Sequence, residues 1–252
     1  MTEPALSPQE AAAVARRALR LLDLTDLSDA CELQAVETLC RDARADGVAA
    51  ICVWPRFVAG AADLLAGSAV RIATVVNFPA GGEDVARTVA ETREAIAMGA
   101  HEIDLVLPYR ALLRGEDAAA REMVVAVRSV CTGGTLLKVI LETGLLAEPE
   151  MIARASTLAL EAGADFLKTS TGKTPISATP DAAETMLRAI RRHGGDRAGL
   201  KVSGGLRHIA DAARYLALAD AVMGPDWASA ATFRIGASAL RHDLVRALEA
   251  VS

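Results

Sequence analysis

Three lysines lie within apolar segments of the sequence, where charged side chains are seldom found. They are Lys138 in LLKVILET, Lys168 in DFLKTS and Lys201 in AGLKVS. A charged group is almost never buried unless an opposite charge pairs with it, so any one of these lysines could belong to a core salt bridge. Three of them brought together without enough counter-charge would cost stability. The repeated pattern therefore favours a functional role.

A buried lysine can act as a nucleophile towards a carbonyl group. Its amine must be unprotonated to attack, and its ordinary pKa is about 10.4. A neighbouring cation and partial burial both disfavour the charged form and lower that pKa. One lysine would then form a Schiff base with an aldehyde while another supplies the perturbing charge. A carboxylate such as Asp104, in HEIDLVLP, could move the protons, with a purely structural hydrogen bond as its alternative role.

Further polar residues lie near the ends of similar apolar segments. They are Asp23, Thr25, Cys52, Asn77, Glu142, Thr169, Ser170, Ser203 and Ser238. Glu142 could simply neutralise Lys138. Cys52 is interpreted as a small buried hydrophobe rather than a nucleophile, because no histidine lies near it in the sequence. With the lysines and Asp104, these residues would meet in one small region if the segments are neighbouring strands.

The elements that must position these residues alternate regularly along the chain. Eight short apolar runs are predicted as strands: Leu19–Thr25, Ala49–Val53, Val70–Asn77, Glu102–Leu107, Leu136–Glu142, Asp165–Ser170, Gly199–Ser203 and Phe233–Gly236. Segments with apolar residues at three- and four-residue spacing, typical of helices, separate them. Eight β-then-α repeats predict an α/β fold, a parallel sheet closed into a (β/α)8 TIM barrel. An open doubly wound sheet is the alternative, but no GxGxxG follows the first strand.

No Pro- or Ser-rich linker divides the sequence, so residues 1–252 are expected to form a single domain. An extra amphipathic helix, Pro8–Arg20, precedes the first strand and is expected to close the N-terminal face of the barrel. The best-marked helix follows Thr179, a natural N-cap, with Pro180 at the first helical position and Gly194 at its end.

Glycine-containing segments follow the predicted strands at the end where a barrel of this kind places its active site. The seventh strand runs into SGG, and the eighth runs into GAS at the start of the last helix. Glycines allow backbone N–H groups to approach a phosphate. The positive end of the helix dipole, at the helix N-terminus, favours the negative charge of the phosphate. The residues expected to bind phosphate are Gly172, Lys173, Gly204, Gly205, Gly236 and Ser238.

Composition narrows the classes of partner. A net charge of -5 without a basic run argues against nucleic acid, and 52% hydrophobic residues indicate a sizeable core. No run approaches the ~18 apolar residues of a membrane-spanning helix, and the N-terminus lacks the apolar region of a secretory signal. The cysteines are scattered and contain no CxxC pair, as expected of reduced thiols in the cytoplasm. The histidines lack metal-ligand spacing, so no metal is expected.

Several segments resemble the deoxyribose-phosphate aldolases. FLKTSTGK at 166–173 is similar to the Schiff-base signature of that family. The resemblance extends along most of the chain through LLDLT at 21–25, ICVWPRF at 51–57, VVNFPAG at 75–81, EIDLVLPYRAL at 102–112, LLKVILETG at 136–144, LKVSGGLR at 200–207 and FRIGAS at 233–238.

The resemblance implies a class I aldolase that reversibly cleaves 2-deoxy-D-ribose 5-phosphate to D-glyceraldehyde 3-phosphate and acetaldehyde, with no cofactor. Lys168 would form the imine, Lys201 would lower its pKa, and Asp104 would relay protons. The supporting residues would be Asp23, Lys138, Thr25 and Cys52. The family also implies a homodimer. Two alternatives remain: another Schiff-base aldolase that acts on a different sugar phosphate, and a non-catalytic sugar-phosphate binder. The presence of Lys168, Lys201 and Asp104 counts against the binder.

Two features depart from the family pattern. The phosphate turn GASS of the family is GASA here, so Ala239 offers no hydroxyl and weaker phosphate binding is expected. The sequence ends in LEAVS, without the extended tail ending in tyrosine of some relatives. A proton-shuttling role of that tyrosine is therefore not expected here.

Overall fold

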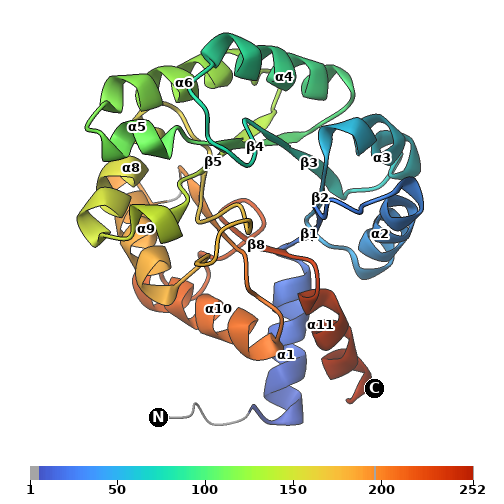
Figure 1. The fold of residues 1–252 in the computed structure, drawn as a ribbon. Helices are drawn as coiled ribbons and strands as arrows, with labels where there is room; N and C mark the ends of the chain where they lie inside the picture. The colour runs from blue at the N-terminus through green and yellow to red at the C-terminus, as the bar shows by residue number, and fades with distance from the viewer. Residues whose placement is uncertain (1–5, 196, 252) are drawn as a thin grey trace.

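Eight parallel strands close into a barrel in the order of the sequence, with β8 pairing back to β1 (Figure 1). The computed structural model describes residues 6–195 and 197–251. The strands are β1 (Leu22–Asp26), β2 (Ala50–Val53), β3 (Arg71–Val76), β4 (Glu102–Val106), β5 (Leu136–Ile140), β6 (Phe166–Lys168), β7 (Gly199–Ser203) and β8 (Phe233–Ala237). The TIM barrel that the sequence predicts is confirmed.

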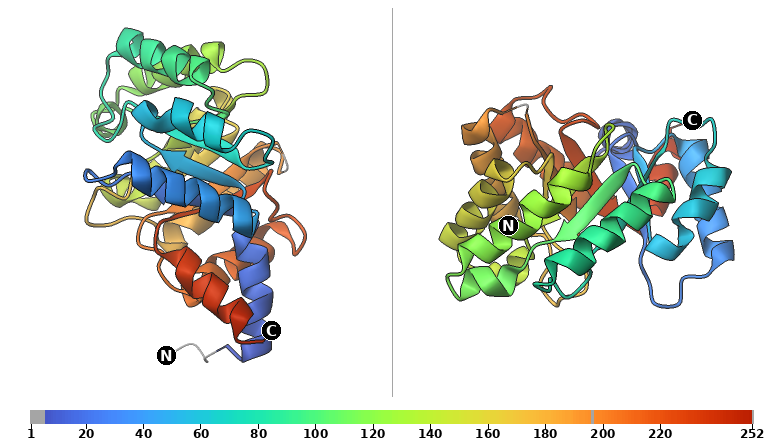
Figure 2. Two further views of the ribbon diagram at one scale, coloured as in Figure 1. Left: turned by 90° about the vertical axis from the view of Figure 1, so that its right-hand side faces the viewer. Right: turned by 90° about the horizontal axis from the view of Figure 1, so that it is seen from above.

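Helices follow the strands and lie outside them (Figures 1 and 2). They are α1 (Pro8–Leu19), α2 (Leu33–Asp46), α3 (Val58–Leu64), α4 (Val85–Ala97), α5 (Tyr109–Leu113), α6 (Asp117–Val130), α7 (Thr143–Leu146), α8 (Pro149–Glu161), α9 (Pro180–His193), α10 (Ile209–Met223) and α11 (Leu240–Glu249), with a short 3-10 helix at Pro55–Phe57. No described helix is long and apolar enough to cross a membrane.

Helix α9 begins and ends as its sequence predicts. The Thr179 side chain accepts a hydrogen bond from the backbone N–H of Ala182 at 3.2 Å, and Pro180 occupies the first turn. Its buried face includes Met186 and Ile190, and Gly194 forms the C-cap. Local capping chemistry is thus sufficient to fix this helix.

The N-terminal helix differs from its prediction in place and in length. Residue Leu19 is the last residue of α1 rather than the first of a strand, and β1 begins at Leu22. The helix lies beside α11 and packs against α11 and α10, so the expected cover over the N-terminal face of the barrel is wrong (Figures 1 and 2). Small buried residues such as Ala15 let it approach these helices closely, and Arg17 pairs with Asp220 of α10 at 2.6 Å.

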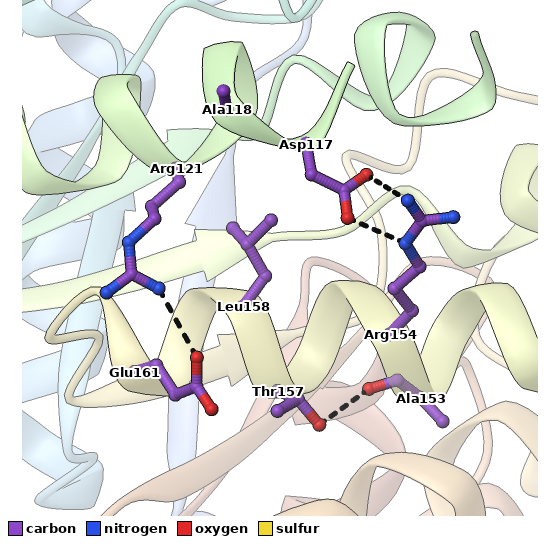
Figure 3. Close-up of a pocket in the computed structure, with 8 residues that line it drawn as sticks. All are labelled: Asp117, Ala118, Arg121, Ala153, Arg154, Thr157, Leu158 and Glu161. Carbon is purple, nitrogen blue, oxygen red and sulfur yellow. Dashed lines mark hydrogen bonds and ion pairs between the residues drawn. The ribbon is translucent and has the colours of Figure 1, made fainter. Parts of the chain in front are cut away.

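The outer helices α6 and α8 are joined by charges on the protein surface (Figure 3). Arg154 binds both carboxylate oxygens of Asp117 at 2.7 Å, and Arg121 pairs with Glu161 at 3.3 Å. Leu158 lies between the two pairs. These four charges satisfy one another, so the shallow hollow between them presents no unpaired group to a ligand.

The inside of the barrel is charged, whereas the layer between strands and helices is apolar. Side chains alternate between the two faces of a strand, so Glu102 and Asp104 of β4 point into the barrel while Ile103 and Leu105 belong to the apolar core. The charged residues of the barrel interior must therefore pair with one another.

Candidate active site

The strand register brings the predicted lysines to the same level. Lys168 of β6 is the register partner of Lys201 of β7, and Asp104 of β4 is the register partner of Lys138 of β5. All four side chains are buried. The convergence predicted from the sequence is therefore present in the structure.

Asp104 is the common partner of the three lysines. Its Oδ2 accepts hydrogen bonds from Lys168 Nζ at 2.7 Å and from Lys201 Nζ at 2.8 Å, and its Oδ1 accepts one from Lys138 Nζ at 2.9 Å. Burial raises the pKa of Asp104, but the three ammonium groups outweigh it and hold that pKa well below its usual value. Asp104 is thus an ionised carboxylate that can accept and return protons.

The three lysines differ in their affinity for a proton. Burial lowers the pKa of Lys168, Asp104 raises it, and the charge of Lys201 lowers it again, so the net pKa is lowered. Burial also lowers the pKa of Lys201, but Asp104 and Asp23 outweigh it and the net pKa is raised. The pKa of Lys138 is likewise raised, because Asp104 and Glu102 outweigh its burial. Lys168 is therefore the amine that loses its proton most readily.

Asp23 connects β1 to this cluster. Its Oδ2 lies 2.6 Å from Lys201 Nζ and 3.8 Å from Lys138 Nζ. Thr25 donates from its hydroxyl to the backbone carbonyl of Asp23 at 2.8 Å. Cys52 is buried among apolar side chains, and burial raises the pKa of its thiol, in agreement with its interpretation as a small hydrophobe.

Two charged residues of the cluster were missed by the sequence analysis. Glu102 pairs with Lys138 at 2.5 Å, and Arg234 pairs with Glu102 at 3.0 Å and with Asp23 at 2.7 Å. Both have buried side chains. The sequence does indicate both residues. Glu102 stands two residues before Asp104, so its side chain faces the same side of the strand. Arg234 lies inside the last apolar run, as the three lysines lie inside theirs.

Glu142 does not neutralise Lys138, so that alternative is wrong. The chain adopts a positive φ of 58° at Glu142, which turns its side chain to the loop after β6. There it accepts hydrogen bonds from the Thr171 hydroxyl at 2.5 Å and the Thr174 hydroxyl at 3.3 Å. Glu142 therefore anchors the loop that carries Gly172, while Lys138 takes its carboxylates from β4 and β1.

A pocket of about 530 Å³ opens above Lys168 and Lys201 at the carboxyl ends of the strands. Its lining includes every residue predicted to bind phosphate. The residues around it are Thr25, Asp26, Leu27, Ser28, Lys168, Thr171, Gly172, Lys173, Lys201, Ser203, Gly204, Gly205, Leu206, Arg207, Gly236, Ala237, Ser238 and Ala239. Asn77 does not line it and instead donates to the carbonyls of Gly82 and Val106.

The backbone of the pocket depends on glycine at two strand ends. Gly204 has a positive φ of 88°, and a Cβ there would lie 2.5 Å from the Ser177 side chain. A Cβ at Gly236 would lie 2.9 Å from both Lys201 Cε and Ser203 Cβ. Larger residues would therefore displace either the loop or the lysine.

Two cationic side chains, Lys173 and Arg207, line the pocket. Lys173 Nζ lies 3.2 Å from Asp29 and 5.8 Å from the centre of the Trp54 ring. Arg207 ends the motif LKVSGGLR, and the sequence alone suggested no role for it. Ser238 and Ala239 lie where α11 begins, and Ala239 makes no side-chain cap.

The described residues contain no group of three or more His, Cys, Asp or Glu side chains placed to hold a metal ion. The histidines are on the surface or partly exposed, as predicted: His101, His193, His208 and His242.

A parallel barrel with a lysine-centred pocket at the carboxyl ends of its strands is the architecture of a lysine-dependent aldolase. The chain belongs to the DeoC/LacD aldolase family, whose model matches residues 17–245. The family membership that the motifs predicted is thus confirmed.

Relatives support the assignment across the whole chain. The sequence is 50% identical over 251 residues to the deoxyribose-phosphate aldolase of Agrobacterium fabrum (strain C58), which covers 98% of this chain and 95% of that protein. A crystal structure from Toxoplasma gondii ME49, provisionally described as a deoxyribose-phosphate aldolase, matches with a TM-score of 0.87 at 27% identity over 98% of each chain. One from Coccidioides immitis, described in the same way, matches with a TM-score of 0.80 at 29% identity, covering 96% of this chain and 88% of that one.

Proposed function

We propose that this protein is a class I aldolase that reversibly cleaves 2-deoxy-D-ribose 5-phosphate to D-glyceraldehyde 3-phosphate and acetaldehyde through an imine on Lys168. The observation that carries the proposal is the arrangement of Lys168. Its amine is buried at the floor of the pocket, shares the Asp104 carboxylate with Lys201, and has a lowered pKa. The name of the Agrobacterium fabrum relative supports the substrate.

The first step is attack on the substrate aldehyde. The lone pair of neutral Lys168 Nζ adds to C1, and the carbonyl oxygen takes up a proton to give a carbinolamine. Loss of water then leaves the iminium ion. Asp104 lies within hydrogen-bond distance of the Lys168 and Lys201 amines, so it can carry the proton to the departing oxygen.

The iminium ion makes cleavage of the carbon–carbon bond possible. A base removes the proton of the C3 hydroxyl, the C2–C3 bond breaks, and its electron pair moves into the imine to give an enamine. D-Glyceraldehyde 3-phosphate leaves. Protonation of the enamine at C2 and hydrolysis of the resulting imine release acetaldehyde and restore Lys168. Asp104 is the carboxylate nearest to the reacting amine, so we assign the proton relay to it.

Imine trapping tests the proposed function. Borohydride added with deoxyribose 5-phosphate should reduce the imine and leave a two-carbon or five-carbon adduct on the peptide that contains Lys168, as read by mass spectrometry. Activity should survive chelation with EDTA, because the predicted mechanism uses no metal. An adduct on Lys138 instead, or loss of acetaldehyde release in EDTA, would contradict it.

The phosphate site is tested by two neighbouring variants with opposite expected effects. Ser238→Asp places a negative charge at the start of α11, and should raise KM for deoxyribose 5-phosphate far more than for deoxyribose. Ala239→Ser adds one hydroxyl and should improve binding of the phosphorylated substrate by about 0.5–1.5 kcal/mol. Equal effects on the two substrates would refute this assignment.

The homodimer stays a prediction that sedimentation equilibrium can check.

A further inference from the structure

Six charged side chains inside the barrel form a closed ring in which carboxylates and cations alternate. On one side, Asp104 contacts Lys138 at 2.9 Å, and Lys138 contacts Glu102 at 2.5 Å. Glu102 then contacts Arg234 at 3.0 Å. Arg234 contacts Asp23 at 2.7 Å. The ring closes through Lys201, which lies 2.6 Å from Asp23 and 2.8 Å from Asp104.

The charges of the ring cancel. It contains three carboxylates and three cations, and each member touches two members of opposite sign. Their pKa values move accordingly: those of the carboxylates are lowered and those of the cations are raised. Lys168 stands outside the ring and contacts only a carboxylate that Lys138 and Lys201 already neutralise. A proton on Lys168 would therefore add an uncompensated charge to a buried site.

Other groups around the ring have smaller effects on this balance. The Cys52 thiol raises the pKa of Lys168, but less than burial and Lys201 change it, and burial raises the pKa of the thiol itself. Arg71 lies 2.8 Å from Glu102, but its side chain is 36% exposed, so water compensates much of its charge.

We propose that Glu102 and Arg234 are positioning residues that close this ring, and that the closed ring is what leaves Lys168 without a carboxylate of its own. Neither residue lines the pocket. They act through Lys138 and Asp23, whose charges they hold in place. The consequence for the reaction rests on the proposed function, but the charge balance itself can be measured without turnover.

Two single variants of the ring should have opposite effects on Lys168. Arg234→Met leaves the ring with a net negative charge and should raise the pKa of Lys168. Glu102→Gln leaves it with a net positive charge and should lower that pKa. One unit charge at about 10 Å in an effective dielectric near 20 shifts a pKa by about one unit, so we expect about one pH unit in each direction. The double variant keeps the ring neutral and should return the pKa close to that of the native protein.

The pKa is read by competitive labelling with acetic anhydride between pH 6 and 10, with the Lys168 peptide quantified by mass spectrometry. Arg154→Met is the matched control, since it removes one arginine charge from the surface pair with Asp117 and should leave Lys168 unchanged (Figure 3). A pH profile of kcat/KM on deoxyribose 5-phosphate is recorded alongside. The part of this profile that reports loss of the proton from Lys168 should shift along the pH axis by the same amount as the labelling curve.

The outcomes separate the two proposals. Opposite shifts in the single variants with recovery in the double variant support the ring, even if no deoxyribose 5-phosphate is cleaved. Shifts in the same direction, or none, overturn it, even if cleavage is normal. Should Arg234→Met fail to fold by circular dichroism, the downward shift in Glu102→Gln and its reversal in the double variant still decide.

Discussion

Lys168 and Lys201 are the same amino acid at the same level of neighbouring strands, yet their pKa values move in opposite directions. Both are fully buried, so burial alone cannot separate them. Lys201 has two carboxylates, Asp104 and Asp23, whereas Lys168 contacts Asp104 alone. The opposite directions of the two pKa shifts therefore follow from one additional carboxylate. The sequence predicts that burial and the charge of Lys201 both lower the pKa of Lys168, and both do so, with burial the larger cause.

Lys201→Leu tests this difference. Without the ammonium group, the cluster around Asp104 and Asp23 has one uncompensated negative charge, and the pKa of Lys168 should rise by about one to three units. A raised pKa leaves less neutral amine at pH 7, so kcat/KM should fall there and recover partly at alkaline pH. The measurement is the pH profile of kcat/KM between pH 6 and 10.

Lys201→Arg is the control, because it retains the charge in a different shape and should keep more activity than Lys201→Leu. A loss of equal size at every pH would show that Lys201 acts as a direct proton donor or a structural contact instead.

At the scale of elements, the site depends on how closely β7 and β8 approach. Gly236 on β8 is the register partner of Ser203 on β7, and the Lys201 side chain crosses over it. The loop after β6 is fixed to β5 by Glu142, and the β6 and β7 ends are tied by a hydrogen bond from Ser203 N–H to the Thr169 hydroxyl at 3.0 Å. The ends of three successive strands are thus held together beneath the loops that we propose bind phosphate.

Gly236→Ala should displace Lys201 and lower kcat by tenfold or more. The added methyl group would lie 2.9 Å from Lys201 Cε, and such overpacking typically costs about 1–3 kcal/mol of unfolding free energy. Steady-state kinetics and urea unfolding measure the two effects. Gly60→Ala in α3 is the matched control, because its methyl group would meet only Leu33 at 3.8 Å and should raise stability by up to about 1 kcal/mol. An unaltered kcat in Gly236→Ala would show that Lys201 tolerates the shift.

The barrel interior holds a cluster of buried charges, whereas the layer between the strands and the helices is apolar. Buried ion pairs of this kind seldom stabilise a fold more than apolar residues of the same volume would, because desolvation offsets their attraction. The apolar layer between strands and helices must therefore supply most of the stability. The charged interior surrounds Lys168, to which we assign the chemistry, and we expect it to make the fold sensitive to acid.

Acid should unfold the protein steeply below about pH 4. The folded-state pKa values of Asp23, Glu102 and Asp104 are lowered, so their stabilising contribution is complete above their unfolded pKa of about 4 and is lost as the pH falls towards the folded values. Glu102→Gln combined with Arg234→Met removes one of these carboxylates. The slope of unfolding free energy against pH should then fall by up to about 1.4 kcal/mol per pH unit.

Urea unfolding between pH 3 and 7, followed by circular dichroism, measures both slopes. An identical slope in the native protein and the double variant would mean that Glu102 does not contribute to acid sensitivity.

The sequence by itself determined the elements and the level of the reactive groups. Strand alternation and helix periodicity are local, so they predicted eight strands, the capped helix after Thr179 and the convergence of Lys168, Lys201 and Asp104. The glycines that follow the last two strands are also a local pattern, and they predicted the position of the pocket. The strands, the capped helix and the glycines depend on residues close together in the chain, and the convergence follows from them once the strands pair in order around a barrel.

Only the tertiary structure decided which charges pair. Glu102 and Arg234 are 132 residues apart in sequence, and they meet because barrel closure brings β4 and β8 across one interior. Closure also brings Lys201 of β7 to Asp104 of β4 and to Asp23 of β1. The position of α1 beside α11 also depends on closure. Helix α1 precedes β1 and helix α11 follows β8, and the two helices become neighbours because β8 pairs with β1. Such pairings depend on the distance between side chains across the barrel, which no local pattern of residues specifies.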